Sequence, residues 1–499
     1  METHVNPAGP LAAVDIGSNS FRLEIGQLTQ ARYRRLDYLK ETVRLGAGLD
    51  ANGMLTEEAV QRGLACLRRF SARLAGCLPG QVRAVATQTL REARNRNAFL
   101  LRAQEALGFP IEVVSGREEA RLIYAGVARL QPAHGPRLVI DIGGRSTELI
   151  LGQGTTPLVA ESFGVGCVGL SMRFFEDGRL TSAAFRAAQV AAGAEFEEGL
   201  QPFARSRWVQ ALGASGTAGA VSQALQAAGQ TDGCITPAGL RWFIERCIAA
   251  GHVDRIDVAG LKPDRRAVLP GGLAILYTLA AHFQIDTLWP AKGALRQGVI
   301  FDLQERLLAL RGEPRDVRDA TVVDLQRRFA VDTAQAARVA QVALALFDAA
   351  MPDAEPETRR ELGWACALHE LGLMVSHHDH HRHSAYLLAH VDAAGFSQSQ
   401  QRRVGDLVLG QRGGLRKIEP QMASETFAWQ VLCLRLAVIK AHARGEISDK
   451  ALALRARGRD AIVDYGSAWA ETHPRTVYLL REEAIAWGRS GPLRLVLPA

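Results

Sequence analysis

Two stretches of this chain carry one pattern: LAAVDIGSNS at Leu11–Ser20 and LVIDIGGRST at Leu138–Thr147. In each stretch an apolar run ends in Asp and continues into a turn of glycine and small polar residues. Four pairs of residues align when the copies are placed 126 positions apart: Asp15 with Asp141, Gly17 with Gly143, Ser20 with Ser146, and Gly26 with Gly152. The repeat predicts a duplicated α/β unit, each copy a buried strand followed by a turn.

The chemistry of the repeated turn favours phosphate. Free backbone N–H groups in a small-residue turn point their dipoles at an anion, and a neighbouring carboxylate can hold the accompanying cation. We therefore predict two phosphate-binding loops that face each other across a cleft. Their residues are Gly17, Ser18, Asn19 and Ser20 in the first loop, and Gly143, Gly144, Arg145 and Ser146 in the second.

The overall composition is that of a globular protein. The chain has 499 residues, of which 47% are hydrophobic and 22% are charged, and its length predicts two to four domains. No apolar run reaches about 18 residues, and the first ten residues lack the pattern of a signal peptide, so neither a membrane span nor secretion is expected. Seven scattered cysteines without a CxxC pair indicate reduced thiols and the cytoplasm.

The net charge of +7 favours an anionic partner. Nucleic acid, a nucleotide or another polyanion would fit, while an arginine-rich proteome would explain the same charge. Six basic residues beyond position 380 are candidates for a track that carries a long anionic chain: Arg382, Arg402, Arg403, Arg412, Arg416 and Lys417.

The order of apolar patterns predicts the domains. Strands and helices alternate up to about residue 305, which is typical of layered α/β structure. Beyond that point the pattern favours amphipathic helices alone, the first of them over residues 325–346. We expect one α/β domain over residues 1–130, a second over 131–305, and an all-helical region over 306–499.

Two further features near the loops have a functional and a structural interpretation. Glu118 and Glu119 follow a helix-capping Ser115, where a carboxylate could take a proton from an attacking water. The same residues could instead offset the positive end of the helix dipole. Arg91, at the end of a strand, could bind a phosphate through two N–H groups or lie solvated at the surface.

The remaining candidates also leave two interpretations open. Glu148 could help Asp141 hold Mg²⁺, or be the polar position of an alternating strand. The turn at Gly213, Ser215, Gly216 and Thr217 could add N–H donors or simply begin a helix. Seven of the thirteen histidines fall within residues 369–390, but no HExxH pair occurs, which favours a structural or anion-contacting role over a metal site.

These motifs occur in the order typical of one family. The chain resembles the exopolyphosphatase/guanosine pentaphosphate phosphohydrolase family over about residues 10–305, through Asp15–Ser20, Arg91, Ser115–Ile123, Asp141–Glu148 and Gly213–Thr217. The remainder resembles the degenerate HD-like helical region of the long bacterial branch. The resemblance implies two ribonuclease-H-like domains of the actin-like ATPase and sugar-kinase superfold.

The resemblance also implies an activity: hydrolysis of the terminal phosphoanhydride of inorganic polyphosphate, with Mg²⁺ and with K⁺ as a second candidate ion. It assigns Glu119 as general base and places Asp141 and Glu148 at the metal and water site. The family's second loop usually reads Gly-Gly-Gly-Ser, so Arg145 either marks a position that needs no positive φ or adds charge beside the phosphates. The resemblance also implies a homodimer. We expect no specific nucleic-acid partner.

Three other functions remain open at this point. Guanosine pentaphosphate, cut to the tetraphosphate, is the nearest rival substrate. An ATPase of the sugar-kinase type is less favoured, because the motifs match the phosphatase branch. A non-catalytic regulator that binds polyphosphate or alarmones would keep the loops without the chemistry.

Overall fold

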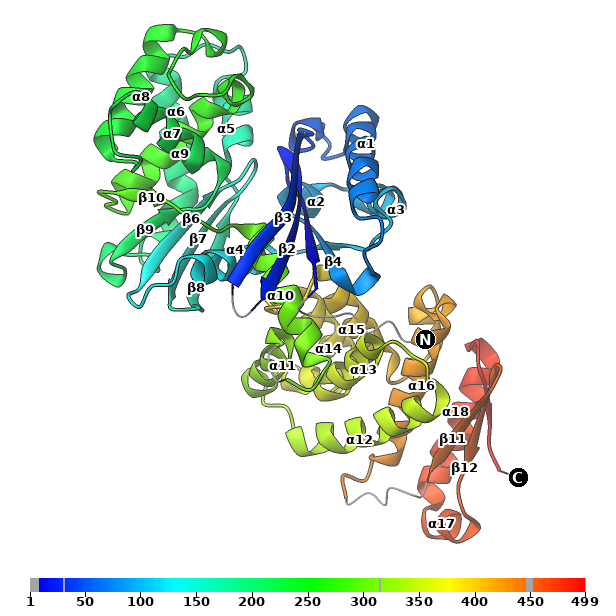
Figure 1. Ribbon diagram of the computed structural model, residues 1–499. Coiled ribbons are helices and arrows are strands. Elements are labelled where there is room, and N and C mark those ends of the chain that lie inside the picture. The colour runs from blue at the N-terminus through cyan, green and yellow to red at the C-terminus, as the bar shows by residue number, and fades with distance from the viewer. Residues whose placement is uncertain (1–8, 30–31, 314–315, 446–451, 499) are drawn as a thin grey trace. The chain divides into compact units, whose positions relative to one another are not determined.

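The computed structural model describes residues 9–29, 32–313, 316–445 and 452–498. The chain forms two compact units, residues 1–315 and residues 316–499 (Figure 1). Residues 1–8, which hold most of the segment without a signal-peptide pattern, lie outside the described part. Among the described helices, none combines the length and the apolar character needed to cross a membrane.

A five-stranded sheet organises the first lobe of the N-terminal unit. Its strands are β1 (Leu11–Ile16), β2 (Ser20–Thr29), β3 (Arg32–Thr42), β4 (Val82–Ala86) and β5 (Ile111–Val113), in the order β3-β2-β1-β4-β5. Strand β1 is antiparallel to β2 and parallel to β4. The connecting helices are α1 (Glu57–Arg73), α2 (Gln88–Glu92) and α3 (Arg96–Leu107).

The second lobe repeats this sheet. Its strands are β6 (Arg137–Ile142), β7 (Thr147–Gln153), β8 (Thr156–Phe163), β9 (Gln210–Gly213) and β10 (Leu288–Pro290), in the order β10-β9-β6-β7-β8. Read from its other edge, this order and its parallel and antiparallel pairings match those of the first sheet. The helices of this lobe are α5 (Cys167–Phe174), α6 (Ser182–Phe196), α7 (Gly216–Ala227), α8 (Pro237–Ala250) and α9 (Leu269–His282).

The duplication extends to irregular details. Both sheets shift register at the same place in the repeat, between Ile25 and Gly26 and between Leu151 and Gly152. A Cβ atom on Gly26 would lie 2.4 Å from the ring of Tyr33, and one on Gly152 would lie 2.3 Å from the ring of Tyr124. The paired glycines thus let a tyrosine ring pack against bare backbone in each copy.

Two helices join the lobes: α4 (Gly116–Leu130), which follows the first sheet, and α10 (Leu295–Ala309), which follows the second. Helix α4 packs on β7 and β8, whereas α10 packs on β1, β2 and β4. A Cβ atom on Gly298 would lie 1.7 Å from the carbonyl oxygen of Leu122, so the two backbones meet directly. The domain boundary expected at 305/306 falls inside α10.

The C-terminal unit is mainly helical. Its α-helices are α11 (Val317–Arg328), α12 (Thr333–Ala350), α13 (Pro356–Leu368), α14 (His380–His390), α15 (Gln398–Gly410), α16 (Glu425–Lys440), α17 (Ser467–Thr472) and α18 (Pro474–Ser490). The single helix expected over 325–346 is wrong, because the chain breaks between α11 and α12. Ala330 has a φ of +49°, and the Asp332 side chain caps α12 by accepting from the Gln335 N–H at 2.9 Å.

A small sheet also corrects the all-helical expectation for this unit. Its strands are β11 (Ala453–Arg457), β12 (Asp460–Asp464) and β13 (Arg494–Val496). Each strand is short and half polar, so its period-two pattern is too brief to recognise in the sequence. Strand β13 also joins from far along the chain, where Arg494 bonds to Asp460, 34 positions away.

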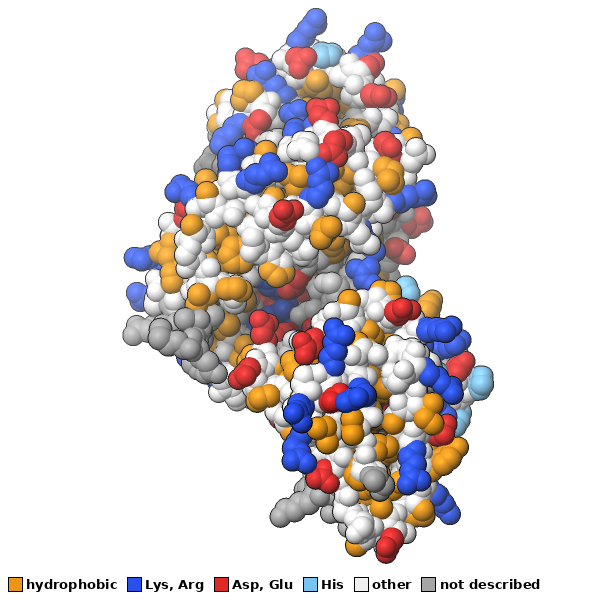
Figure 2. All heavy atoms as spheres, turned by 90° about the vertical axis from the view of Figure 1, so that its right-hand side faces the viewer, with side chains coloured by type: hydrophobic (Ala, Val, Ile, Leu, Met, Phe, Trp, Pro, Cys, Tyr) orange, Lys and Arg blue, Asp and Glu red, His pale blue; other side chains and the backbone are white. Residues whose placement is uncertain are grey.

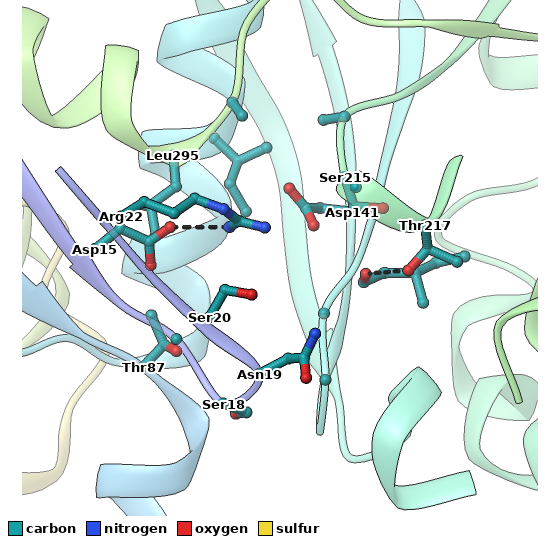
Figure 3. A pocket seen from close by; sticks show the side chains of 18 of the residues that line it. Asp15, Ser18, Asn19, Ser20, Arg22, Thr87, Asp141, Ser215, Thr217 and Leu295 are labelled. Atoms are coloured by element: carbon teal, nitrogen blue, oxygen red, sulfur yellow. Dashed lines mark hydrogen bonds and ion pairs between the residues drawn. The ribbon is translucent and has the colours of Figure 1, made fainter. Parts of the chain in front are cut away.

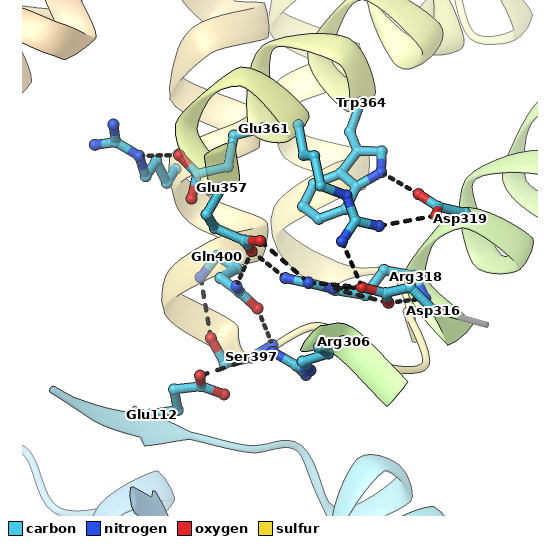
Figure 4. Close-up of polar contacts among 12 residues, drawn as sticks. Glu112, Arg306, Asp316, Arg318, Asp319, Glu357, Glu361, Trp364, Ser397 and Gln400 are labelled. Carbon is cyan, nitrogen blue, oxygen red and sulfur yellow. Dashed lines mark hydrogen bonds and ion pairs between the residues drawn. The ribbon is translucent and has the colours of Figure 1, made fainter. Parts of the chain in front are cut away.

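A buried arginine fixes the start of the C-terminal unit (Figure 4). The Arg318 side chain is 1% exposed, donates from Nη2 to Asp316 Oδ2 at 2.7 Å, pairs with Glu357 and lies over the Trp364 ring. These contacts tie the beginning of α11 to α13. Because its charge is fully paired, this cluster is structural.

Candidate active site

The two repeated turns line one cavity of about 300 Å³ in the N-terminal unit (Figure 3). Twelve of the residues predicted from the sequence line it: Gly17, Ser18, Asn19, Ser20, Glu119, Asp141, Gly143, Gly144, Ser146, Ser215, Gly216 and Thr217. In Figure 3 the first loop lies on one side of the cavity, and Asp141, Ser215 and Thr217 lie opposite. The structure therefore brings together residues that are up to 200 positions apart in the sequence.

Both loops have a glycine where the backbone of the turn approaches itself closely. A Cβ atom on Gly17 would lie 3.0 Å from the Ser20 carbonyl oxygen, and one on Gly143 would lie 3.1 Å from that of Ser146. Neither glycine has a positive φ. The glycines suit these positions because each turn folds tightly onto itself, and a side chain would require the facing carbonyl to shift.

Further contacts hold the two loops in position. The Thr89 hydroxyl donates to Ser18 Oγ at 2.8 Å, which fixes the first loop against α2. A Cβ atom on Gly144 would lie 3.0 Å from that of Ser18, so the second loop packs directly on the first. The facing turns are therefore held at a fixed separation.

The N-terminus of α7 forms a third wall of the cavity. Ser215 caps this helix by accepting from the Ala218 N–H at 3.3 Å, and the Thr217 hydroxyl donates to the Ile142 carbonyl at 3.1 Å. Free N–H groups at the start of a helix attract anions. Gly213 does not line the cavity; it lies in β9, where a Cβ atom would stand 2.6 Å from that of Ala218.

Glu119 and Asp141 bring negative charge to the cavity. Glu119 is buried in the first turn of α4, and Arg91 Nη1 donates to its Oε2 at 2.8 Å. Burial raises the pKa of Glu119, although Arg91 acts against this shift. Burial, followed by the charge of Glu119, raises the pKa of Asp141 to about 7, and Arg22 opposes this shift.

Glu148 lies behind the cavity lining. It pairs with Asp141 across the β6–β7 hairpin and accepts from the Ser162 hydroxyl at 2.8 Å. Burial, then the charges of Glu119 and Asp141, raises its pKa well above the usual range. Its carboxylate thus interacts with both acids of the cavity without being among the residues that line it.

The two copies of the repeat differ at one decisive position. Arg22 and Glu148 are equivalent, since each pairs across its hairpin with the repeated Asp. In the first copy Arg22 Nη1 lies 3.1 Å from Asp15 Oδ2 and neutralises it. In the second copy a second carboxyl group, that of Glu148, lies beside Asp141. The second hairpin therefore has two neighbouring acids where the first has an ion pair.

Among the further lining residues that the sequence did not single out are one tyrosine and four cations: Arg22, Tyr38, Lys40, Arg265 and Arg296. Burial, then the charges of Arg265 and Arg22, lowers the pKa of Lys40, which shows how closely these cations gather. A Cβ atom on Gly216 would lie 2.5 Å from Arg265 Nη2, so this guanidinium covers the start of α7. The position of Arg22 opposite Asp15 could have been predicted from the pairing of the two strands around the first turn. No local sequence motif marks Lys40 or Arg265.

Arg91 lies outside the cavity lining and acts on Glu119 instead. Its Nη1 also donates to the Val114 carbonyl at 3.0 Å, and its Nε donates to Gln88 Oε1 at 2.9 Å. These bonds fix the guanidinium against Glu119. In this structure Arg91 positions a carboxylate rather than facing the cavity.

Arg145 points away from the cavity. Its Nε donates to Glu92 Oε2 at 2.8 Å, and its Nη1 donates to the Gly46 carbonyl at 3.3 Å, which links the second lobe to the first. Its φ is not positive. The position therefore needs no glycine, which favours the first of the two explanations given for Arg145.

We expect Arg145→Ala to change catalytic turnover by less than about threefold, because the guanidinium does not face the cavity. The lost ion pair is partly exposed, so stability should fall by about 1 kcal/mol or less. Steady-state kinetics and thermal unfolding would check this, with Arg117→Ala, which loses the comparable pair with Glu161, as the control. A tenfold loss of activity specific to Arg145→Ala would show that this side chain contacts substrate.

Glu118 serves the scaffold. Its carboxylate accepts from Arg121 Nε at 2.8 Å, and Arg121 Nη2 donates to Asp302 on α10 at 2.5 Å. Arg83 Nη1 donates to the same aspartate at 2.7 Å. This buried network joins α4, β4 and α10, so Glu118 has a structural role, whereas Glu119 lines the cavity.

The histidine-rich segment lies in the C-terminal unit. His369 is buried, and its Nδ1 lies 2.7 Å from the Cys366 carbonyl oxygen. Across the described residues of the whole chain, no three His, Cys, Asp or Glu side chains converge as a set of metal ligands.

Comparison with known proteins identifies the family. Residues 28–307, more than half of the chain, match the Ppx/GppA phosphatase family, and residues 317–484 match domain III of Ppx/GppA phosphatases. The chain belongs to the Ppx/GppA phosphatase family. The match begins at residue 28, after the first loop, so the placement of Gly17–Ser20 rests on the repeat and on the cavity.

Solved structures share the fold of this Ppx/GppA phosphatase. An exopolyphosphatase-like protein is 24% identical with a TM-score of 0.55, and the alignment covers 60% of this chain and 98% of that protein. An exopolyphosphatase from Cytophaga hutchinsonii is 23% identical with a TM-score of 0.54, with coverage of 60% and 98%. At these identities the likeness concerns the fold.

Proposed function

We propose that this Ppx/GppA phosphatase hydrolyses the terminal phosphoanhydride of inorganic polyphosphate and releases orthophosphate. One observation carries the proposal: two tight loops with backbone N–H groups face each other across a cavity that Glu119 and Asp141 line together with Arg22, Lys40 and Arg265. A linear chain of phosphoryl groups matches both loops and the cations. The buried Glu119 lines the same cavity, which supports a role for it toward a water at the end of such a chain.

We infer Mg²⁺ as the cofactor, with K⁺ as a second candidate. Enzymes of phosphate esters and anhydrides commonly hold Mg²⁺ through one or two carboxylates together with substrate phosphates. The carboxylates of Asp141 and Glu148 fit that arrangement. Asp141 lines the cavity, and Glu148 lies next to it on the neighbouring strand, behind the lining. When bound, Mg²⁺ would neutralise charge on the phosphate oxygens.

In the proposed reaction, the loops bind non-bridging oxygens and align the terminal phosphorus with a water molecule. Glu119 accepts a proton from this water as its oxygen bonds to phosphorus, and the anhydride oxygen leaves with the shortened chain. Its raised pKa makes Glu119 a better base than an exposed glutamate. Arg91, which donates to Oε2, holds the Glu119 carboxylate in place, and the cations of the cavity offset the charge of the leaving chain.

Guanosine pentaphosphate is the second candidate substrate. The ring of Tyr38 lines the cavity, and an aromatic ring there could stack on a guanine base. We favour the polymer because the charged residues newly identified in the lining, Arg22, Lys40, Arg265 and Arg296, are all cations. By resemblance we also infer ribonuclease-H-like lobes, an HD-like C-terminal unit, a homodimer and a cytoplasmic location.

Phosphate release with Mg²⁺ would test the proposal, with long-chain polyphosphate and guanosine pentaphosphate compared by kcat/KM. We expect a preference for the polymer of about tenfold or more, corresponding to about 1.4 kcal/mol. Tyr38→Leu serves as a matched control, since removing the ring should affect the nucleotide and spare the polymer. A preference for the nucleotide that Tyr38→Leu abolishes would assign the enzyme to alarmone turnover instead.

A further inference from the structure

One strained backbone position lies beside the first loop of the cavity. A positive φ is disfavoured for residues with a side chain, and five described residues other than glycine have one: Arg44, Gln284, Ala330, Asp379 and Arg444. Among these five, Arg44 alone donates its N–H to a residue that lines the cavity, Asn19. Backbone strain persists where surrounding contacts impose it, so the contacts of Arg44 show what this strain maintains.

The side chain of Arg44 does not explain the strain. It is exposed, and its guanidinium forms no ion pair or hydrogen bond with any other described residue. Exposed basic side chains are also common on this protein, and many are spread over the face shown in Figure 2. The contacts of Arg44 that set it apart are therefore those of its backbone.

The segment that follows β3 holds two successive carbonyl groups of the first loop. The Asn19 carbonyl accepts from the N–H groups of Val43 at 3.1 Å and Arg44 at 2.9 Å. The Ser18 carbonyl accepts from the N–H of Gly46 at 2.8 Å. The φ of +52° at Arg44 turns the chain between these donors, so that all three N–H groups reach the loop. We call residues 43–46 the loop brace.

These bonds set the direction of an N–H group in the loop itself. In a trans peptide the N–H points opposite to the preceding carbonyl. Because the Ser18 carbonyl bonds to the loop brace, the Asn19 N–H points the other way, and no described residue accepts from it. A Cβ atom on Gly144 would lie 3.4 Å from the Asn19 nitrogen. The Asn19 N–H is thus a free donor where the two loops approach each other (Figure 3).

The second loop is held in the same manner without strain. Its Gly144, which is equivalent to Ser18 in the repeat, has a carbonyl that accepts from the N–H groups of Val168 at 2.8 Å and Gly169 at 3.0 Å. Both donors lie in the first turn of α5, where N–H groups are free to bond outside the helix. A helix start presents successive N–H groups without a positive φ, whereas the loop brace presents them through Arg44.

We propose that Arg44 is a positioning residue of the first loop: its positive φ keeps the Ser18 and Asn19 carbonyls bonded to the loop brace and thereby presents the Asn19 N–H to phosphate. That the loop binds phosphate rests on the proposed function, whereas the bonds of the loop brace do not. A residue that rejects a positive φ would release these carbonyls and let the Asn19 peptide rotate. Arg44 acts through its backbone and does not touch the substrate.

The test compares substitutions that differ in the backbone conformation they allow. Arg44→Val and Arg44→Gly remove the same charge, but β-branched valine rejects a positive φ while glycine adopts it freely. Gln284→Val is the control for strain alone, because Gln284 is exposed, has a φ of +54° and does not line the cavity. Each variant is made in the full chain with Glu119→Gln. Titration calorimetry then measures tripolyphosphate binding with Mg²⁺, and thermal unfolding measures stability.

We expect Arg44→Val to weaken tripolyphosphate binding about tenfold or more, the usual loss of a hydrogen bond to a charged group. Arg44→Gly should stay within about twofold of the Glu119→Gln protein. Gln284→Val should lower the melting temperature and leave the affinity unchanged. Arg44→Gly as weak as Arg44→Val would assign the effect to the side chain and overturn the proposal. Unchanged binding in Arg44→Val, or an equal loss in Gln284→Val, would also overturn it.

This outcome is separate from that of the proposed function. Hydrolysis of polyphosphate by the unaltered enzyme tests the function, whereas the ratio of affinities between Arg44→Val and Arg44→Gly tests the positioning. If turnover favours guanosine pentaphosphate, the proposed function fails. The ratio still decides the role of Arg44, because that nucleotide also ends in a triphosphate.

Discussion

Glu119→Gln should slow phosphate release by about 10²–10⁴-fold, the usual contribution of a positioned general base. Glutamine keeps the shape and can still accept the hydrogen bond from Arg91, so the site should stay folded. The amide cannot take a proton from water. We therefore expect kcat to fall while KM for polyphosphate stays within about threefold of the parent value.

The neighbouring carboxylate provides the control for this prediction. Glu118→Gln alters the same turn of α4, but Glu118 pairs with Arg121 in the buried network and does not line the cavity. That variant should lose stability while retaining most of its activity per folded molecule. Near-normal turnover in Glu119→Gln, or an equal fall in kcat for both variants, would remove Glu119 from the role of base.

Asp141→Asn should abolish most activity and yet stabilise the protein at alkaline pH. The pKa of Asp141 is raised to about 7 from an ordinary value of 3.8, so the folded state resists ionisation of this group. The stability it provides is fully present below about pH 4 and is lost as the pH rises through 7. Asparagine carries no charge, so the variant should gain over the parent as the pH rises.

Thermal or urea unfolding at pH 4.5 and pH 8, without divalent cations, would measure this effect. Because Asp141 is partly exposed to the cavity, we expect a gain of roughly 1–3 kcal/mol at pH 8 and little at pH 4.5. Added Mg²⁺ should stabilise the parent and not the variant. A variant less stable than the parent at pH 8 without Mg²⁺ would show that the Asp141 charge is already compensated within the protein.

The sequence predicted the parts of the site that lie on local motifs. The strand and turn around Asp15, the strand and turn around Asp141, and the cap at Ser115 are all short-range patterns, and the structure confirms each of these elements. The duplication could be recognised in the sequence because its glycines and aspartates recur at a constant spacing. These features depend on neighbours within a few residues, which is the range over which sequence patterns are informative.

Features that depend on contacts between residues far apart in the sequence could not be predicted from such patterns. Lys40 and Arg265 meet at the cavity only because two lobes close around it, and no local motif marks either residue. Arg91 suited phosphate by type, but its orientation toward Glu119 follows from bonds to Gln88 and Val114. The sheet of β11, β12 and β13 was missed because its strands are short and pair across a long interval.

The exchange of α4 and α10 between the lobes bears on how such a molecule could arise. Each helix follows the last strand of its own sheet and packs on the sheet of the other copy. A single copy would therefore leave its final helix without a sheet and one face of its sheet without a covering helix. Such an ancestor would be complete only as a symmetric pair that swapped this helix, and fusion of two genes would then have made the exchange permanent within one chain.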